Sequence, residues 1–133
     1  MAARAFSGVQ TLGKGIVTIQ GRFRPNGASA IDNTLNRGRG WSVARTGVGA
    51  YAVTLEDKYV DAVAVIPSVQ VNTLLKGCVQ LTGAVDATAG PSAAAFTIQY
   101  QEETAGALAA AEIASNANNW VHFVAVLRNS ELV

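Results

Sequence analysis

The side chains that most often carry chemistry are scarce in this sequence, and they do not fall into catalytic groupings. The chain has one histidine, His122, and one cysteine, Cys78. A zinc site needs three or four nitrogen, sulfur or oxygen ligands at suitable spacing, which one His and one Cys do not supply. A serine or cysteine nucleophile needs a nearby base, and His122 is the only imidazole. We therefore interpret His122 as a packed or edge-strand histidine and Cys78 as a reduced strand residue.

The carboxylates also lack the arrangement of an acid–base pair. Glu56–Asp57 and Glu102–Glu103 are adjacent pairs, and neighbouring residues of a strand point to opposite faces of its sheet. Neither pair can share a proton as a catalytic dyad does, so we interpret both as solvated strand ends. A calcium site built from Glu56, Asp57 and Asp61 is the alternative, although the spacing of a calcium-binding loop is missing. The sequence thus predicts no enzyme, no metal and no cofactor.

Two glycine-rich tracts carry basic residues, Leu12-Gly-Lys-Gly15 and Arg37-Gly-Arg-Gly-Trp41. A phosphate-binding loop needs a Lys-Ser/Thr pair after its glycines and then a helix, and neither follows here. The second tract could stack on single-stranded nucleic acid, whereas a loop that is solvated or contacts a neighbouring protein is the simpler interpretation. The pI near 7.9 also argues against a dedicated nucleic-acid binder.

Alternation of apolar and polar residues predicts strands along most of the chain. The alternating runs lie at residues 17–24, 41–46, 51–55, 63–71, 79–85, 96–101 and 121–127. Thr46-Gly47-Val48-Gly49 separates two of them and predicts a tight hairpin, because its glycines can adopt positive φ. Pro67 lies inside another run and predicts an edge strand or a bulge, since proline cannot donate to a strand ladder.

The remaining stretches do not alternate. We expect residues 26–40 to form a long polar loop and the Ala-rich residues 104–118 to form a loop with a short helical turn. Residues 1–14 are predicted to be an extended arm that orders only against another chain. Residues 15–133 are predicted to be a single β domain with antiparallel pairing, because no helical crossovers separate the strands. This all-β fold would be a β-sandwich, a jelly-roll-like fold or a small barrel.

Composition points to assembly. Charged residues make up only 14% of the chain, against about 25% in an average soluble domain, which suggests that partners cover part of the surface. Residues 1–55 hold seven basic side chains and one acid, a net charge of +6, whereas residues 56–133 have a net charge of −5. These charges either mix on the folded surface or form faces that meet between subunits. No apolar run is long enough to predict a membrane-spanning helix.

Two stretches of the sequence resemble a known family. Ser42-Val-Ala-Arg-Thr-Gly-Val-Gly-Ala-Tyr-Ala-Val-Thr-Leu55, followed by Asp57, is similar to a strand–turn–strand of phage decoration and fibre-like proteins. Trp120-Val-His-Phe-Val-Ala-Val-Leu-Arg-Asn-Ser130 resembles their C-terminal strand. From residue 22 to residue 132 the chain thus resembles the head decoration, or cement, proteins of tailed bacteriophages. Residues 104–118 and the loop at 37–39 depart from that pattern.

This resemblance implies a structural virion protein, made in the bacterial host cytoplasm, that binds the outside of the capsid and stabilises it. It also implies a homotrimer whose other partner is the major capsid protein, with no role for nucleic acid or membrane. The alternatives are a tail-fibre or baseplate domain, and a carbohydrate-binding sandwich using Trp41, Tyr51, Tyr59, Tyr100 and Trp120. The residues expected to contact the capsid or another subunit lie on the arm and in the polar loop: Arg4, Phe6, Lys14, Arg37, Arg39 and Trp41.

Overall fold

The computed structural model describes residues 15–129, which form eight β-strands and one 3-10 helix. The elements are β1 (Ile16–Phe23), η1 (Asn33–Leu35), β2 (Trp41–Gly47), β3 (Ala50–Leu55), β4 (Asp61–Gln70), β5 (Gly77–Thr82), β6 (Phe96–Thr104), β7 (Ala107–Ala110) and β8 (Trp120–Arg128). The expected arm at residues 1–14 lies outside the described residues, as do residues 130–133.

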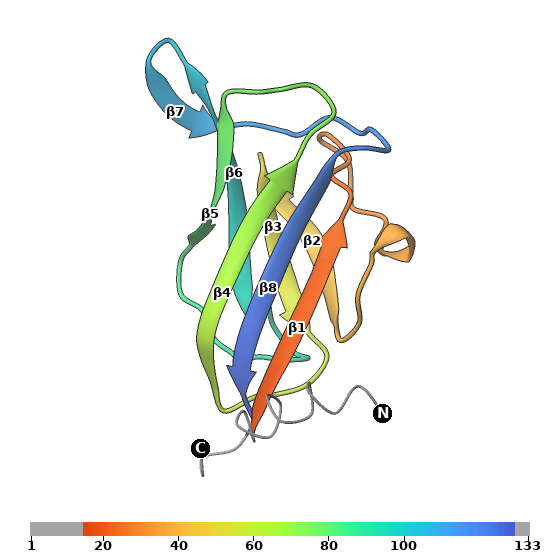
Figure 1. The fold of residues 1–133 in the computed structure, drawn as a ribbon, viewed down its shortest axis with the longest axis vertical. Helices are drawn as coiled ribbons and strands as arrows, with labels where there is room; N and C mark the ends of the chain where they lie inside the picture. The colour runs from red at the N-terminus through yellow and green to blue at the C-terminus, as the bar shows by residue number, and fades with distance from the viewer. Residues whose placement is uncertain (1–14, 130–133) are drawn as a thin grey trace, which may run out of the picture.

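The strands form two antiparallel sheets that pack face to face, so the all-β sandwich expected from the sequence is confirmed. One sheet has the order β1-β8-β4, with the long strand β8 in its centre. The other has the order β2-β3-β6-β5, and β7 pairs with the far end of β6. Figure 1 shows the first sheet in front of the second, with the β6–β7 hairpin projecting beyond both.

The core lies between the sheets and is centred on aromatic rings. Phe23 of β1, Trp41 of β2 and Phe123 of β8 pack edge to face, with ring centroids of Trp41 and Phe123 4.8 Å apart. Tyr51 and Phe96 extend the same cluster. These residues lie on the apolar sides of the alternating runs, so the alternation correctly predicts which side chains are buried.

Both local predictions from turn residues are confirmed. The hairpin between β2 and β3 turns at residues 48–49, where Gly49 has φ +63°, and a bulge separates Arg45 from Gly47. Pro67 lies on β4, which is an edge strand of its sheet and has its own register shift between Ala62 and Ala64. Proline has no backbone N–H to donate. On the solvent side of an edge strand no neighbouring strand needs that donor, so proline is tolerated there.

The short helical turn expected within residues 104–118 is wrong. β6 continues to Thr104, the chain reverses through Ala105 and Gly106, and β7 pairs back onto β6. The remaining residues run as a loop that places Ile113, fully buried, in the core. The helix propensity of alanine does not decide the structure here. β6 extends past the end of β3 and so has unpaired backbone groups, and β7 forms hydrogen bonds with them.

The polar loop at residues 26–40 is fastened to both sheets. The Asn33 side chain exchanges hydrogen bonds of 2.9 Å with the backbone N–H and C=O of Val43 on β2. Four residues later, Arg37 forms an antiparallel bridge with Arg22 of β1, through backbone bonds of 3.0 and 2.9 Å. The loop therefore closes the side of the sandwich where edge strands β1 and β2 lie (Figure 1).

Candidate interaction surface

The outer face of the β1-β8-β4 sheet, which points away from the core, carries a row of basic side chains. Register places Arg22 of β1 opposite His122 of β8, and His122 opposite Ser68 of β4. Because Arg37 is bridged to Arg22 on the other side, the order across the sheet is Arg37, Arg22, His122. Residues directly opposite in an antiparallel pair have Cβ atoms roughly 5 Å apart on the same face. We call Arg37, Arg22 and His122 the basic row.

The loop carrying Arg37 approaches β1 closely because the residue after Arg37 is glycine. Gly38 has φ +105°, and a Cβ built there would lie 2.3 Å from the backbone oxygen of Gln20. A side chain at this position would force the loop away from the strand. The sequence feature that allows this approach is the glycine of Arg37-Gly-Arg. From conformational propensity alone, this glycine indicates only a flexible loop.

Trp120 holds Arg22 in place. Its ring lies on the outer face at the start of β8, 9% exposed, and the Arg22 guanidinium stacks over it at 4.2 Å from the ring centroid. Arg24 lies 5.9 Å from the same ring, and the indole N–H of Trp120 donates to the carbonyl of Ala117. The indole thus serves as a cation–π platform for Arg22.

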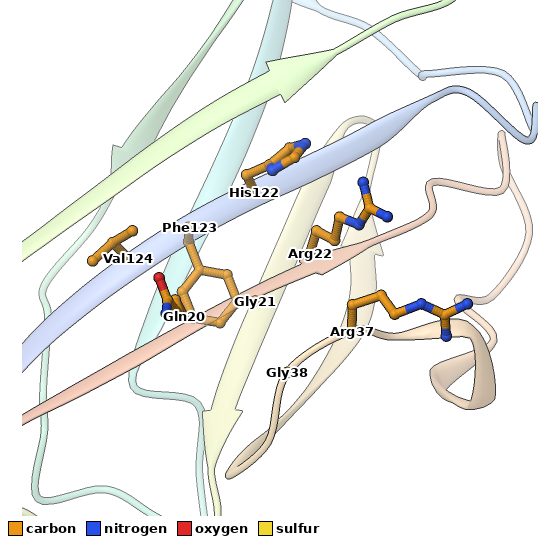
Figure 2. A pocket seen from close by; sticks show the side chains of 8 residues that line it. All are labelled: Gln20, Gly21, Arg22, Arg37, Gly38, His122, Phe123 and Val124. Atoms are coloured by element: carbon orange, nitrogen blue, oxygen red, sulfur yellow. The ribbon is translucent and has the colours of Figure 1, made fainter. Parts of the chain in front are cut away.

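A shallow pocket of about 320 Å³ lies where β1 and β8 meet the loop that carries Arg37 and Gly38 (Figure 2). Arg22 of β1, Arg37 of the loop and His122 of β8 all line it. Beneath it lies Trp41, whose indole N–H is buried without a hydrogen-bond partner among residues 15–129. The Trp41 nitrogen is so close to the pocket wall that a Cβ on Gly38 would lie 3.1 Å from it. The remaining lining residues are Gln20, Gly21, Phe123 and Val124.

The basic row has no internal counter-charge within the described chain. The ion pairs of residues 15–129 join Arg45 to Glu112, Lys76 to Glu103 and Arg128 to Asp61. Burial, and then the positive charge of Arg22, lower the pKa of His122 below its usual 6.5. His122 is therefore mostly neutral at pH 7, and the row carries its charge on the two guanidinium groups.

An apolar strip lies next to the basic row on the same outer face. Val124 and Val126 of β8 pair with Ile66 and Ala64 of β4, and all four point away from the core. Ile66 is 62% exposed, and Val63, in the bulge of β4, is 57% exposed. The outer face thus combines guanidinium groups with exposed aliphatic side chains, as the centre and rim of a protein interface do.

Comparison with protein-family models, curated proteins and solved structures found no match. Within residues 15–129, no helix is long and apolar enough to cross a membrane. The same part of the chain contains no grouping of three or more His, Cys, Asp or Glu side chains placed to hold a metal ion.

The structure brings together only part of the predicted contact set. Arg37 lies in the basic row, and Arg39, exposed in the same loop, does not line the pocket. Trp41 is 6% exposed and belongs to the core, so only its indole nitrogen lies near the pocket. The predicted contacts on the arm lie outside the described residues: Arg4, Phe6 and Lys14.

Sequence reasoning missed two members of the row, Arg22 and His122. The alternation of residues 17–24 places Arg22 on the polar face, but only the register of β1 against β8 puts it opposite His122. The rings considered for sugar binding are not displayed: Trp41, Tyr51 and Tyr100 are in the core, Tyr59 is half-buried, and Trp120 lies beneath Arg22.

Proposed function

We propose that this chain is a structural virion protein that binds the outside of a phage head and stabilises the shell. The observation that carries the proposal is the outer face of the β1-β8-β4 sheet, where the basic row adjoins the apolar strip. Most single exposed aliphatic residues need no explanation, but a contiguous strip beside stacked arginines is typical of a protein-binding surface. The step from a protein-binding surface to a phage head comes from the family resemblance of residues 42–55 and 120–130.

The sandwich suits such a role because binding would not require it to reorganise. Every strand of the outer-face sheet is fixed by ladder hydrogen bonds along β8, and its inner face is anchored in the aromatic core. A partner that docks on this face therefore meets a surface whose backbone is already ordered, which lowers the entropic cost of binding. The expected partners are the major capsid protein and, in a trimer, further copies of this chain.

Co-sedimentation with empty heads that lack this protein tests the proposal. We expect the wild-type chain to pellet with the heads and to raise the temperature at which they rupture. Ile66→Asp places a charge in the apolar strip and is expected to weaken binding at least about tenfold, since a buried unpaired carboxylate costs several kcal/mol. Leu74→Asp is the matched control, because Leu74 is 94% exposed in the loop after β4.

Three results would count against the proposal. One is a stable monomer that leaves the heads in the supernatant, and another is Ile66→Asp binding as tightly as Leu74→Asp. Immunogold labelling of intact particles supplies the third: gold on the tail in place of the head would favour the fibre or baseplate alternative.

A further inference from the structure

We infer that the basic row is a carboxylate-binding site, which takes an Asp or Glu side chain of the protein that docks on the outer face. The inference rests on the proposed function only for the identity of that protein. The site consists of Arg22, Arg37 and His122 and the pocket that all three residues line (Figure 2).

The positive charges of Arg22 and Arg37 repel each other, and no carboxylate of the described chain compensates for this. Arg22 and Arg37 face each other directly across an antiparallel bridge, and like charges in that position destabilise a sheet. No carboxylate within residues 15–129 forms an ion pair with either of them. The backbone bonds between the two residues keep them paired despite their like charges. An incoming carboxylate would relieve this repulsion and gain charge-assisted hydrogen bonds from both.

The Arg22 side chain and the backbone of the loop that carries Arg37 are already positioned. Arg22 is stacked on Trp120 at 4.2 Å, and Arg37 is fixed at its backbone by the bridge to β1. Gly38 allows the loop to lie against β1, and Asn33 fastens the other end of the loop to β2. The Arg22 side chain and the loop backbone therefore lose little freedom on binding, and only the exposed Arg37 side chain has to become ordered.

The surroundings favour a protein carboxylate over a nucleic-acid phosphate. Across the sheet the row is followed by Ser68 of β4, and along β8 the next outward residue is Val124, so both neighbours are uncharged. A nucleic-acid track needs basic side chains that continue along a backbone. Arg24, the nearest further arginine, shares its surroundings with the carboxylate of Asp32. An acidic residue flanked by apolar ones matches this surface on both counts.

Proton NMR of the only histidine provides a direct readout, because the C2–H resonance of His122 reports the protonation of one member of the site. The probe is a peptide of six glutamates, titrated into the full chain, with a peptide of six glutamines as control. Binding should shift the His122 resonance and raise the pKa of His122, since a nearby negative charge favours the imidazolium. Arg22→Gln and Arg37→Gln should each weaken the peptide at least about tenfold, as expected for loss of one charge-assisted contact.

Arg39→Gln is the matched control, because Arg39 lies in the same exposed loop and carries the same charge but does not line the pocket. The inference is overturned if Arg39→Gln weakens the peptide as much as Arg37→Gln, or if the His122 resonance does not respond. It is also overturned if a twelve-nucleotide oligothymidine binds more tightly than the peptide and is lost in the same variants. Arg37 is exposed, so its replacement should leave folding intact and keep the test valid even if Arg22→Gln is unstable.

The same variants separate this inference from the proposed function. If the peptide binds as expected but wild-type chain does not pellet with heads, the carboxylate site stands and the proposed function fails. If the chain pellets with heads but neither arginine variant affects peptide binding, the proposed function stands and the site is wrong.

Discussion

Trp41 combines a structural ring with an unsatisfied donor. Its ring is in edge-to-face contact with Phe23 and Phe123 and joins β2 to the opposite sheet. On the other side, Gly21 is packed so tightly that a Cβ there would lie 2.3 Å from the ring. The sequence places Trp41 beside two exposed arginines and so suggests a surface contact, whereas the structure assigns its ring to the core.

Trp41→Ala should therefore destabilise the fold and not merely weaken an interface. Removing a buried Trp side chain costs about 3–5 kcal/mol, because apolar contacts are lost and a cavity remains. Urea unfolding followed by circular dichroism should show the lower midpoint. Arg39→Ala, two residues earlier and exposed, should leave the midpoint unchanged. Equal unfolding curves for Trp41→Ala and wild type would contradict the core position.

The ion pair of Arg45 and Glu112 ties two distant segments together. One carboxylate oxygen of Glu112 accepts from the Arg45 guanidinium, with Nε at 2.9 Å, and the other accepts from the backbone N–H of Gly49 at 2.6 Å. Both side chains are about a fifth exposed, at 21% and 23%. The hydrogen bonds from Arg45 and from Gly49 lower the pKa of Glu112.

Glu112→Gln should lower the free energy of unfolding by about 1–2 kcal/mol at pH 7, since it removes a charge-assisted pair. A carboxyl whose folded pKa is lowered contributes its stabilisation above the unfolded pKa of about 4.5 and loses it as pH falls through the folded pKa. The difference between wild type and Glu112→Gln should therefore shrink below pH 4.5 in urea titrations across pH. If the difference in unfolding free energy stayed constant from pH 7 to pH 3, Glu112 would stabilise the fold through packing and not through its charge.

At the scale of elements, the β6–β7 hairpin shows where local propensity fails. Residues 104–118 are rich in alanine, and alanine favours helix in isolation. The structure instead uses Ala105 and Gly106 as a two-residue turn with φ of +54° and +83°. Ala105 adopts the left-handed region without being glycine, at a cost of about 1 kcal/mol.

Ala105→Asn should stabilise this hairpin, because Asn-Gly is the preferred pair for a turn with two positive φ angles. We expect a gain of up to about 1 kcal/mol in the local opening free energy, measured by hydrogen exchange of the Thr104 and Ala107 amides. Ala109→Asn, exposed in β7, is the control and should give no gain. If exchange became slower in Ala109→Asn but not in Ala105→Asn, the turn geometry at residue 105 could not be the cause of the stabilisation.

Strands were predictable from the sequence because alternation reports burial directly, as Phe96, Ile98 and Tyr100 on one face of β6 show. The pairing of strands was not predictable. Residue 22 lies opposite residue 122 because of the register of β1 against β8, and opposite residue 37 because of a bridge outside the named strands. Asn33 illustrates the same limit. Its amide takes the place of a strand neighbour for Val43, and nothing in its local sequence marks it.

For the molecule as a whole, the charge asymmetry between the halves of the sequence acquires a spatial meaning. Arg22, Arg24, Arg37 and Arg39 come from the basic half and lie on β1 or the loop beside it. Acidic residues of the second half pair elsewhere, Glu112 with Arg45 and Asp61 with Arg128. Within residues 15–129, Arg22 and Arg37 thus form no ion pair with a carboxylate, which is the arrangement that an external acidic partner requires.

Folding and binding should use opposite faces of the same strand, and β8 allows a matched test. Val121 is fully buried in the core, and Val124 lies in the apolar strip on the outer face. Val121→Thr buries a hydroxyl in an apolar core and should cost about 1–3 kcal/mol of unfolding free energy. Val124→Thr makes the identical chemical change on the outer face and should stay within about 0.5 kcal/mol.

Binding to empty heads should respond in the reverse order. At a temperature where both proteins are folded, Val124→Thr should weaken co-sedimentation, because it places a hydroxyl in the centre of the apolar strip. Val121→Thr should bind as the wild type does, since its outer face is unchanged. If Val121→Thr lost binding and Val124→Thr kept it, a part of the molecule other than the outer face of the β1-β8-β4 sheet would have to carry the contact.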